Sequence, residues 1–476
     1  MNDRRDALLH EDLIVPLHHH IKADDVLLAT VPGEPARVVS PAQAGAIVAQ
    51  HRPVPALDEV ETAEGGPRRF ARSEMLRGGA VLGLGALLAA TAGPRMSFAA
   101  TGSRDLLVVI FLRGGMDGLS AVVPVNDPAY YAARPKTAVR AEDTFALDSR
   151  FAMNKNMAAL KPMWKARELA CVVGSGTAGL RRSHFEDMSL CERAAPANVR
   201  SGWLGRHLAT SSSTQGTFRA ITVGSSATLS LAANFETVAL TDIASFDLQA
   251  WEGVRPAVLR MMHRLYGDIG GPVQASAART LDAVNGLASV RASTATYVPA
   301  GGATYPASPF GKGLSQIAQI AKGGKGLEVA CIDIGDWDMH QRLGSAKNPQ
   351  DWFSRSSRDL AEGLAAFRTD LGGRWASTTV VTMSEFGRRV AENGDTGLDH
   401  GTGNVAFVAG GSVHGGKVYG SLPSLQPSNL RSGDVPVTVD YRQALSEIVT
   451  RRLGDGSHLA AVFPGFTPAA KPLGIV

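Results

Sequence analysis

Apolar residues gather in short runs that fit the buried strands of a parallel sheet. The clearest is Leu106–Leu112, which is apolar throughout. A strand covered by helices on both faces shows no alternation of apolar and polar positions, so such a run predicts a central strand. Further runs of this kind are 169–173, 218–223, 327–333, Thr378–Met383 and 405–408.

Helical patterns separate these runs. Apolar residues recur at helical spacing at Leu360, Leu364, Phe367 and Leu371. Other helices are predicted at 157–167, 183–194, 256–291, around 317–321 and at 441–452, with a surface loop at 294–307. Strands that alternate with helices indicate an α/β fold with a doubly wound, mainly parallel sheet. We expect residues 101–476 to form one such domain.

A different pattern precedes this domain. Residues 67–77 read PRRFARSEMLR, residues 78–93 form a Gly/Ala/Leu-rich apolar run, and a small-x-small site ends at Ala99. Basic, apolar and small segments in this order are typical of a cleaved export signal. The run is shorter than the roughly 20 residues of a membrane span. The sequence therefore predicts a twin-arginine-type signal peptide at 67–100 and a periplasmic or secreted protein, exported folded and without a stable membrane span.

The match to the twin-arginine pattern is incomplete, and an alternative stays open. The pattern is two arginines, any residue, then Phe and Leu. Arg68 and Arg69 form a true pair, but Phe70 follows them directly, one place too early. The alternative is a buried, Gly-rich core helix, although such helices rarely follow a basic stretch and end at a small-x-small site. Residues 1–66 are predicted to be a disordered leader or the result of a mis-assigned start.

Composition narrows the possible partners. The net charge is +4 over 476 residues, and the basic residues are spread rather than gathered among aromatic ones. Nucleic-acid binding is therefore not expected. The three cysteines are too few, and odd in number, for a disulfide framework.

Polar side chains stand close to the ends of the predicted strands. In an open α/β sheet, ligands bind beyond the carboxyl ends of the strands. The residues in these positions, and in the loop before the last run, are Arg113, Asp117, Arg182, Ser183, His184, Asp333, Asp336, Asp338, His340, Glu385, Arg388, Asp399 and His400. Carboxylates and imidazoles bind Zn, Mn, Mg or Ca, so the sequence predicts one or two divalent ions in a shared site.

Several of these residues also have an interpretation without chemistry. Asp117 can make a turn, and Ser183 with Glu186 three residues later fits a helix capping box. Glu385 and Arg388 can pair one helical turn apart. We favour a shared site because turns alone do not explain five polar clusters beside predicted core strands.

Longer motifs resemble a known family. The segments are FLRGGMDGL with VPVNDPAYYAARP, RSHFEDM with SGWLGRHL, DIGDWDMH, and TMSEFGRRVAENGDTGLDHGTGN. They resemble an uncharacterised "domain of unknown function" family of exported bacterial proteins, grouped with the alkaline-phosphatase and sulfatase-like superfamily. The resemblance covers most of residues 104–470. It implies an alkaline-phosphatase-like α/β core, two metals held by Asp and His, and a nucleophile at a helix start.

The resemblance carries over to this chain in part. It places Ser183 as the nucleophile, and Glu385-Phe386 stands where the superfamily has a late Asp-His pair. The sulfatase Cys-x-Pro-x-Arg motif is absent, so a formylglycine sulfatase is not expected. Arg113 and Arg182 are candidates to grip an anionic substrate. The predicted metal ligands are Asp117, Asp333, Asp336, His340, Glu385 and His400.

Two functions follow from these observations. The first is a metal-dependent hydrolase of a phosphate, sulfate or phosphonate ester with a small anionic substrate. The second is a catalytically degenerate exported protein that binds or assembles with a partner on the same fold. The resemblance implies that this partner is a second exported protein.

Overall fold

The computed structural model describes residues 105–476 apart from 212–218, 233–236, 247–254, 325 and most of 268–296. It forms two units, Met1–Phe70 and Ala71–Val476. In residues 1–104 it describes only short strands, which are β1 (Ile14–Pro16), β2 (Leu27–Ala29), β3 (Arg37–Val39), β4 (Val60–Glu61) and β5 (Pro67–Arg68). The leader and the export signal lie almost entirely outside the described residues, so both stay predictions.

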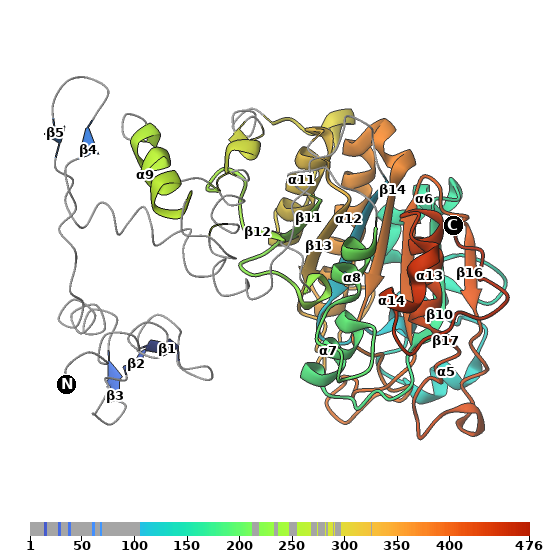
Figure 1. The fold of residues 1–476 in the computed structure, drawn as a ribbon. Coiled ribbons are helices and arrows are strands. Elements are labelled where there is room, and N and C mark those ends of the chain that lie inside the picture. The colour runs from blue at the N-terminus through green and yellow to red at the C-terminus, as the bar shows by residue number, and fades with distance from the viewer. Residues whose placement is uncertain are drawn as a thin grey trace, which may run out of the picture. The chain divides into compact units, whose positions relative to one another are not determined.

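A mixed, mostly parallel sheet organises the second unit (Figure 1). Its order is β12-β11-β13-β6-β14-β15-β10-β16, with β17 also paired to β10. Only β15 runs antiparallel to its neighbours within this described sheet. The strands are β6 (Leu106–Leu112), β10 (Leu169–Gly176), β11 (Ala220–Val223), β12 (Val238–Leu240), β13 (Val329–Ile334), β14 (Thr378–Met383), β15 (Asn404–Gly410), β16 (Lys417–Gly420) and β17 (Val439–Asp440). The predicted α/β fold class is confirmed.

A small antiparallel sheet accompanies the main one. Its order is β7-β9-β8, formed by Val122–Val123, Ala152–Asn154 and Thr144–Ala146. The helices are α4 (Gly118–Ala121), α5 (Pro128–Ala133), α6 (Lys161–Lys165), α7 (His184–Arg193), α8 (Trp203–Thr210), α9 (Arg255–Gly267), α11 (Pro309–Lys322), α12 (Trp352–Leu371), α13 (Tyr441–Arg451) and α14 (Leu459–Val462). Among the described residues, no helix combines the length and the apolar character needed to cross a membrane.

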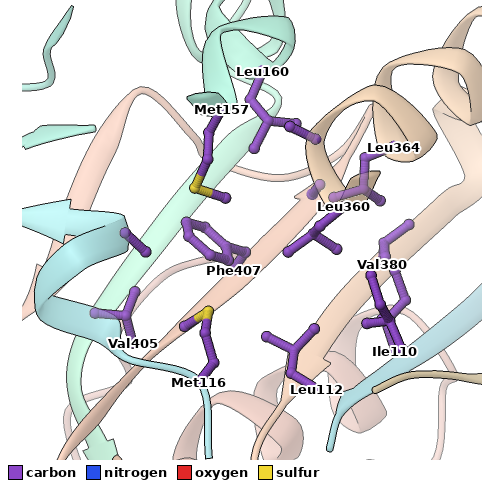
Figure 2. Packing of buried hydrophobic residues seen from close by; sticks show 14 of the residues in the cluster. Ile110, Leu112, Met116, Met157, Leu160, Leu360, Leu364, Val380, Val405 and Phe407 are labelled. Atoms are coloured by element: carbon purple, nitrogen blue, oxygen red, sulfur yellow. The ribbon is translucent and has the colours of Figure 1, made fainter. Parts of the chain in front are cut away.

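Helices cover both faces of the main sheet. The even-numbered residues of β6, such as Ile110 and Leu112, pack in one cluster with Leu360 and Leu364 of α12 (Figure 2). The odd-numbered residues, such as Val109, pack in a second cluster with residues of α8 and α13. Because successive side chains of a strand point to opposite faces, β6 must be apolar at every position, as its sequence is.

One predicted helix differs in detail. Residues 157–167 were expected to be helical throughout, but the segment begins as the 3-10 helix Lys155–Leu160 and becomes α-helical only at α6. Pro162 lies in the first turn of α6, where its missing N–H removes no helical hydrogen bond. The proline therefore fits the start of a new helix better than the middle of a longer one.

The strand directions decide what meets at the edge of the sheet. β6, β10, β13 and β14 are parallel to one another, so the segments after them leave at the same edge. β15 is antiparallel to both β10 and β14, so the residues that precede it lie at that edge too. His400, four residues before β15, is thereby brought to the loops that follow β10 and β13.

Candidate metal centre

Four side chains converge at this edge of the sheet. They are His184, Asp338, His340 and His400, and each offers a ligand atom within 4.8 Å of the others. His184 is the first residue of α7, Asp338 and His340 follow β13, and His400 precedes β15. Segments far apart in the chain therefore supply one cluster.

The Nδ1 atom of each histidine in the cluster faces an oxygen acceptor. His184 Nδ1 lies 2.7 Å from Glu385 Oε1, and His400 Nδ1 donates to the carbonyl of Arg182 at 2.7 Å. His340 Nδ1 lies 3.4 Å from Asp399 Oδ1. An acceptor at Nδ1 fixes the ring and leaves the lone pair on Nε2, the arrangement commonly found around metal-bound histidines.

Asp338 Oδ1 and the three Nε2 atoms lie close together. Those of His340 and His400 lie 2.8 Å apart. Asp338 Oδ1 lies 3.1 Å from Nε2 of His340, 3.3 Å from that of His184 and 3.7 Å from that of His400. Ligand atoms of a tetrahedral site with bonds of about 2 Å lie about 3.3 Å apart, so these separations are of the right size for one ion.

The environment of His184 Nε2 supports the same interpretation. This nitrogen is buried and makes no hydrogen bond among the described residues, and Asp338 Oδ1 lies 3.3 Å from it. A buried polar atom without a hydrogen bond is costly, and a bound ion would satisfy it. Three imidazole nitrogens and one carboxylate oxygen form a donor set that fits Zn²⁺ or a similar divalent ion. The residues present therefore fit a metal.

The protonation states suit metal binding at two ligands. Burial lowers the pKa of His400, and the charges of Arg388, His184 and His340 lower it further. Burial alone would raise the pKa of Asp338, but the hydrogen bond and the charge of Arg388 bring it below its usual value. His400 thus presents a neutral imidazole and Asp338 a charged carboxylate, the forms that bind metals. The hydrogen bond to Glu385 raises the pKa of His184.

One side of the cluster is open to solvent. The side chains of Asp338 and His340 are 49% and 43% exposed, and those of His184 and His400 are 21% exposed. Structural zinc sites are closed, whereas catalytic sites keep a position for water or substrate. This exposure favours a site that substrate can reach.

The structure brings some of the predicted ligands together. His340 and His400 are members of the cluster. Glu385 is not a member but contacts one. It is fully buried, and its Oε1 lies 2.7 Å from His184 Nδ1 and accepts from the backbone N–H of Gly114 at 2.8 Å. Arg388 pairs with Asp338 and not with Glu385.

The other predicted ligands are not in the cluster. Asp117 is buried in an ion pair with Arg134 at 2.5 Å and caps α4 by accepting from the Ser120 N–H. Asp333 pairs with Arg113 Nε at 2.6 Å. Asp336 is exposed, with its backbone in the left-handed region at φ +63°. The carboxylate that joins the histidines is instead Asp338, two residues after Asp336.

Ser183 lies beside the cluster, at the N-cap position of α7, but its side chain makes no capping hydrogen bond. The capping box with Glu186 is therefore not formed. The Asp187 carboxylate takes this role, accepting from the backbone N–H groups of Arg181, Arg182 and Ser183 at 2.7 to 3.2 Å. The structure thus leaves the Ser183 hydroxyl without an assigned structural task.

The two predicted anion-binding arginines are both ion-paired. Arg113 contacts Asp333 at 2.6 Å and the buried Glu192 at 3.3 Å. Arg182 lies 3.2 Å from the buried Asp434 and is 38% exposed. Arg113 is compensated by two carboxylates, so Arg182 is the better placed of the two to meet an anion.

His184 and Asp338 were not among the ligands predicted from sequence. A signal for Asp338 exists in the segment Trp337-Asp338-Met339-His340. Trp337 and Met339 are 1% and 2% exposed, whereas Asp338 and His340 are nearly half exposed. This alternation is the pattern of an extended segment with its polar side chains on one side.

The comparisons with known proteins bear on family and fold. A family model described as "Protein of unknown function (DUF1501)" matches residues 173–442, which include all four residues of the cluster. No curated protein matches the sequence.

Solved structures that are similar to this chain include the following three. The C-terminal periplasmic domain of EcEptC from Escherichia coli is 10% identical, with 79% of this chain and 92% of that chain covered and a TM-score of 0.31. PsFucS1 sulfatase from Pseudoalteromonas sp. is 11% identical, with 76% of this chain and 71% of that chain covered and a TM-score of 0.30. The phosphonate monoester hydrolase of Agrobacterium radiobacter is 9% identical, with 77% of this chain and 79% of that chain covered and a TM-score of 0.29. The case for a function therefore rests on the site itself.

Proposed function

Because this chain belongs to the DUF1501 family of proteins of unknown function, whose model covers more than half of it, its activity has to be inferred from its site, and we propose that it is a metal-dependent hydrolase of phosphate, sulfate or phosphonate esters. One observation carries the proposal. The Nε2 atoms of three histidines and an oxygen of Asp338 converge, while each Nδ1 faces an acceptor.

The residues around the centre have distinct tasks in this proposal. His184, Asp338, His340 and His400 would hold the ion, and Glu385 keeps the His184 ring oriented. A bound divalent ion would polarise the ester and lower the pKa of water.

The open side of the cluster would admit the substrate. The half-exposed Arg182, whose backbone carbonyl accepts from His400, would meet its negative charge. The attacking group is either the Ser183 hydroxyl or a water molecule. In both cases the bond from phosphorus or sulfur to the leaving-group oxygen breaks and the leaving group takes up a proton. Attack by Ser183 would first form a seryl ester, which water then hydrolyses.

A second candidate is a catalytically degenerate protein that binds or assembles with another exported protein. The ion pairs of Asp117 with Arg134 and of Asp333 with Arg113 favour it. These pairs occupy two of the carboxylates predicted as ligands. A single group that could hold a metal remains among the described residues, where the superfamily resemblance implies two ions.

Metal analysis followed by an activity screen distinguishes the two. We expect the full-length chain, purified without chelator, to contain about one divalent ion per molecule, as a single four-ligand site implies. The metal-free protein is then supplied with Zn, Mn, Mg or Ca and assayed with p-nitrophenyl phosphate, p-nitrophenyl sulfate and a phenyl phosphonate ester. Bound metal without turnover would support the degenerate protein. Protein that takes up no ion would rule out both the centre and the hydrolase.

We also propose that the chain is exported folded to the periplasm or beyond. The order of basic, apolar and small residues at 67–100 supports this. Residues 67–100 fused to a folded reporter should carry it to the periplasm, and replacing Arg68 and Arg69 with lysine should stop it. Export that persists without the twin-arginine translocase would assign another pathway.

A further inference from the structure

Arg388 is a buried cation in direct contact with the cluster. It is 2% exposed, and its Nη2 donates to Asp338 Oδ1 at 2.7 Å. Its Nη1 lies 3.4 Å from His340 Nε2. Asp338 Oδ1 is the atom that lies closest to all three histidines, so Arg388 holds the carboxylate that would face the ion.

The same guanidinium binds backbone carbonyls from several loops. Nε donates to Gly115 O at 2.7 Å and Nη1 to Leu398 O at 2.9 Å. Nη2 also donates to the carbonyls of Gly114 and Trp337. These loops follow β6 and β13 and precede β15. Arg388 thus joins the segment that carries Asp338 and His340 to the one that carries His400.

Two glycines allow the loop after β6 to pack closely against its neighbours. Gly114 and Gly115 have φ of +114° and +64°, a region that side chains rarely adopt. A Cβ on Gly114 would lie 2.6 Å from the backbone nitrogen of Asp338, and one on Gly115 would lie 2.6 Å from the Phe386 ring. The Gly-Gly pair after β6 therefore lets this loop, whose carbonyls accept from Arg388, lie against the segment that carries Asp338 and against Phe386.

We propose that Arg388 is a positioning residue of the metal centre, which fixes Asp338 and the loops around it in the geometry that binds the ion. This inference rests on the proposed function. It also explains why the residue is arginine. A guanidinium offers five N–H donors in a rigid plane, whereas lysine has a single nitrogen that cannot reach acceptors on so many segments.

Arg134 provides a matched control. It is fully buried, pairs with Asp117 at 2.5 Å, and donates to the carbonyls of Val390 and Arg389 at 2.7 and 2.9 Å. It therefore has the same chemistry as Arg388, a buried arginine on an aspartate and backbone carbonyls. Its aspartate, however, is not a member of the cluster.

The test compares full-length wild type, Arg388→Lys and Arg134→Lys. Co²⁺ is titrated into each metal-free protein and followed by its visible absorption, Zn²⁺ affinity is measured against a chelator, and thermal unfolding is recorded. We expect Arg388→Lys to bind Zn²⁺ about 10- to 100-fold more weakly, the range for groups that orient metal ligands, with an altered Co²⁺ spectrum. Arg134→Lys should unfold at a lower temperature but keep the wild-type affinity and spectrum.

The outcomes separate this inference from the proposed function. A wild-type protein that binds neither ion would end the proposed function. Wild-type affinity and spectrum in Arg388→Lys, or an equal loss in Arg134→Lys, would overturn only the role of Arg388. If Arg388→Lys does not fold, Arg388→Gln, which removes the charge but keeps two donors, is measured in its place. If neither folds while Arg134→Lys does, Arg388 supports the fold as a whole and the inference is rejected.

Discussion

Replacing His400 with alanine should remove the metal and reduce hydrolysis by about 1000-fold or more, because a bound ion contributes several kcal/mol to the transition state and each 1.4 kcal/mol is about tenfold in rate. His400 Nε2 lies 2.8 Å from that of His340, and its Nδ1 is held by the Arg182 carbonyl. No neighbouring side chain in the cluster can replace it. The ring is 21% exposed, so its loss leaves no closed core cavity, and we expect the protein to remain folded.

The matched control for this variant is His414→Ala. His414 is exposed and its Nδ1 also donates to a backbone carbonyl, that of Gly474 at 3.0 Å. It lies outside the cluster, so metal content and turnover should stay at the wild-type level. Metal is measured by mass spectrometry on protein purified without chelator, and folding by circular dichroism. A His400→Ala protein that retains wild-type metal content would show that the ion, if any, binds elsewhere.

The central strands could be predicted because burial leaves a direct trace in sequence. β6 is buried at all seven positions, and a continuous apolar run is what such burial requires. β16 (Lys417–Gly420) has no buried position and β17 has two residues. Their place in the sheet comes from pairing with β10, a contact between distant segments that no local pattern records.

Strand direction was also beyond the sequence, and it matters for the site. An apolar run looks the same whether its strand runs parallel or antiparallel to its neighbours. β15 is antiparallel to β10 and β14, so the residues before it, and not those after it, lie at the functional edge. From the sequence, His400 was selected with the polar clusters that follow the predicted core strands; in the structure it lies at the shared edge because it precedes the antiparallel strand β15.

The choice between Asp336 and Asp338 shows a second limit. Asp336 was predicted as a ligand because its spacing from His340 matches the Asp-x-x-x-His pair that the superfamily resemblance implies, whereas residues two apart share one side of an extended segment. The structure has no helix between β13 and α12, so the extended rule applies and Asp338 joins His340. Asp117 was misleading for a different reason, because its partner Arg134 lies 17 residues away and nothing local reveals the pair.

Ser183→Ala should separate two chemistries that the site allows. At this N-cap position the side chain makes no capping hydrogen bond, so the variant should lose less than the roughly 1 kcal/mol of a typical capping serine. If the hydroxyl is the nucleophile, turnover should fall by about 1000-fold or more, because a covalent pathway needs that oxygen. Metal content should not change, since Ser183 is outside the group of four ligands.

The control is Asp187→Ala, which should lower the unfolding temperature while affecting turnover much less than loss of a nucleophile would. Asp187 is 1% exposed and accepts from three backbone N–H groups at the start of α7. Its loss removes hydrogen bonds from three partly buried N–H groups to a charged carboxylate, each worth about 1.5 to 3 kcal/mol, so the unfolding temperature should drop clearly. Both variants are assayed with the best ester from the screen and melted by calorimetry. Full turnover in Ser183→Ala would assign the attack to water, while a large drop in its unfolding temperature would show that the serine stabilises the helix start after all.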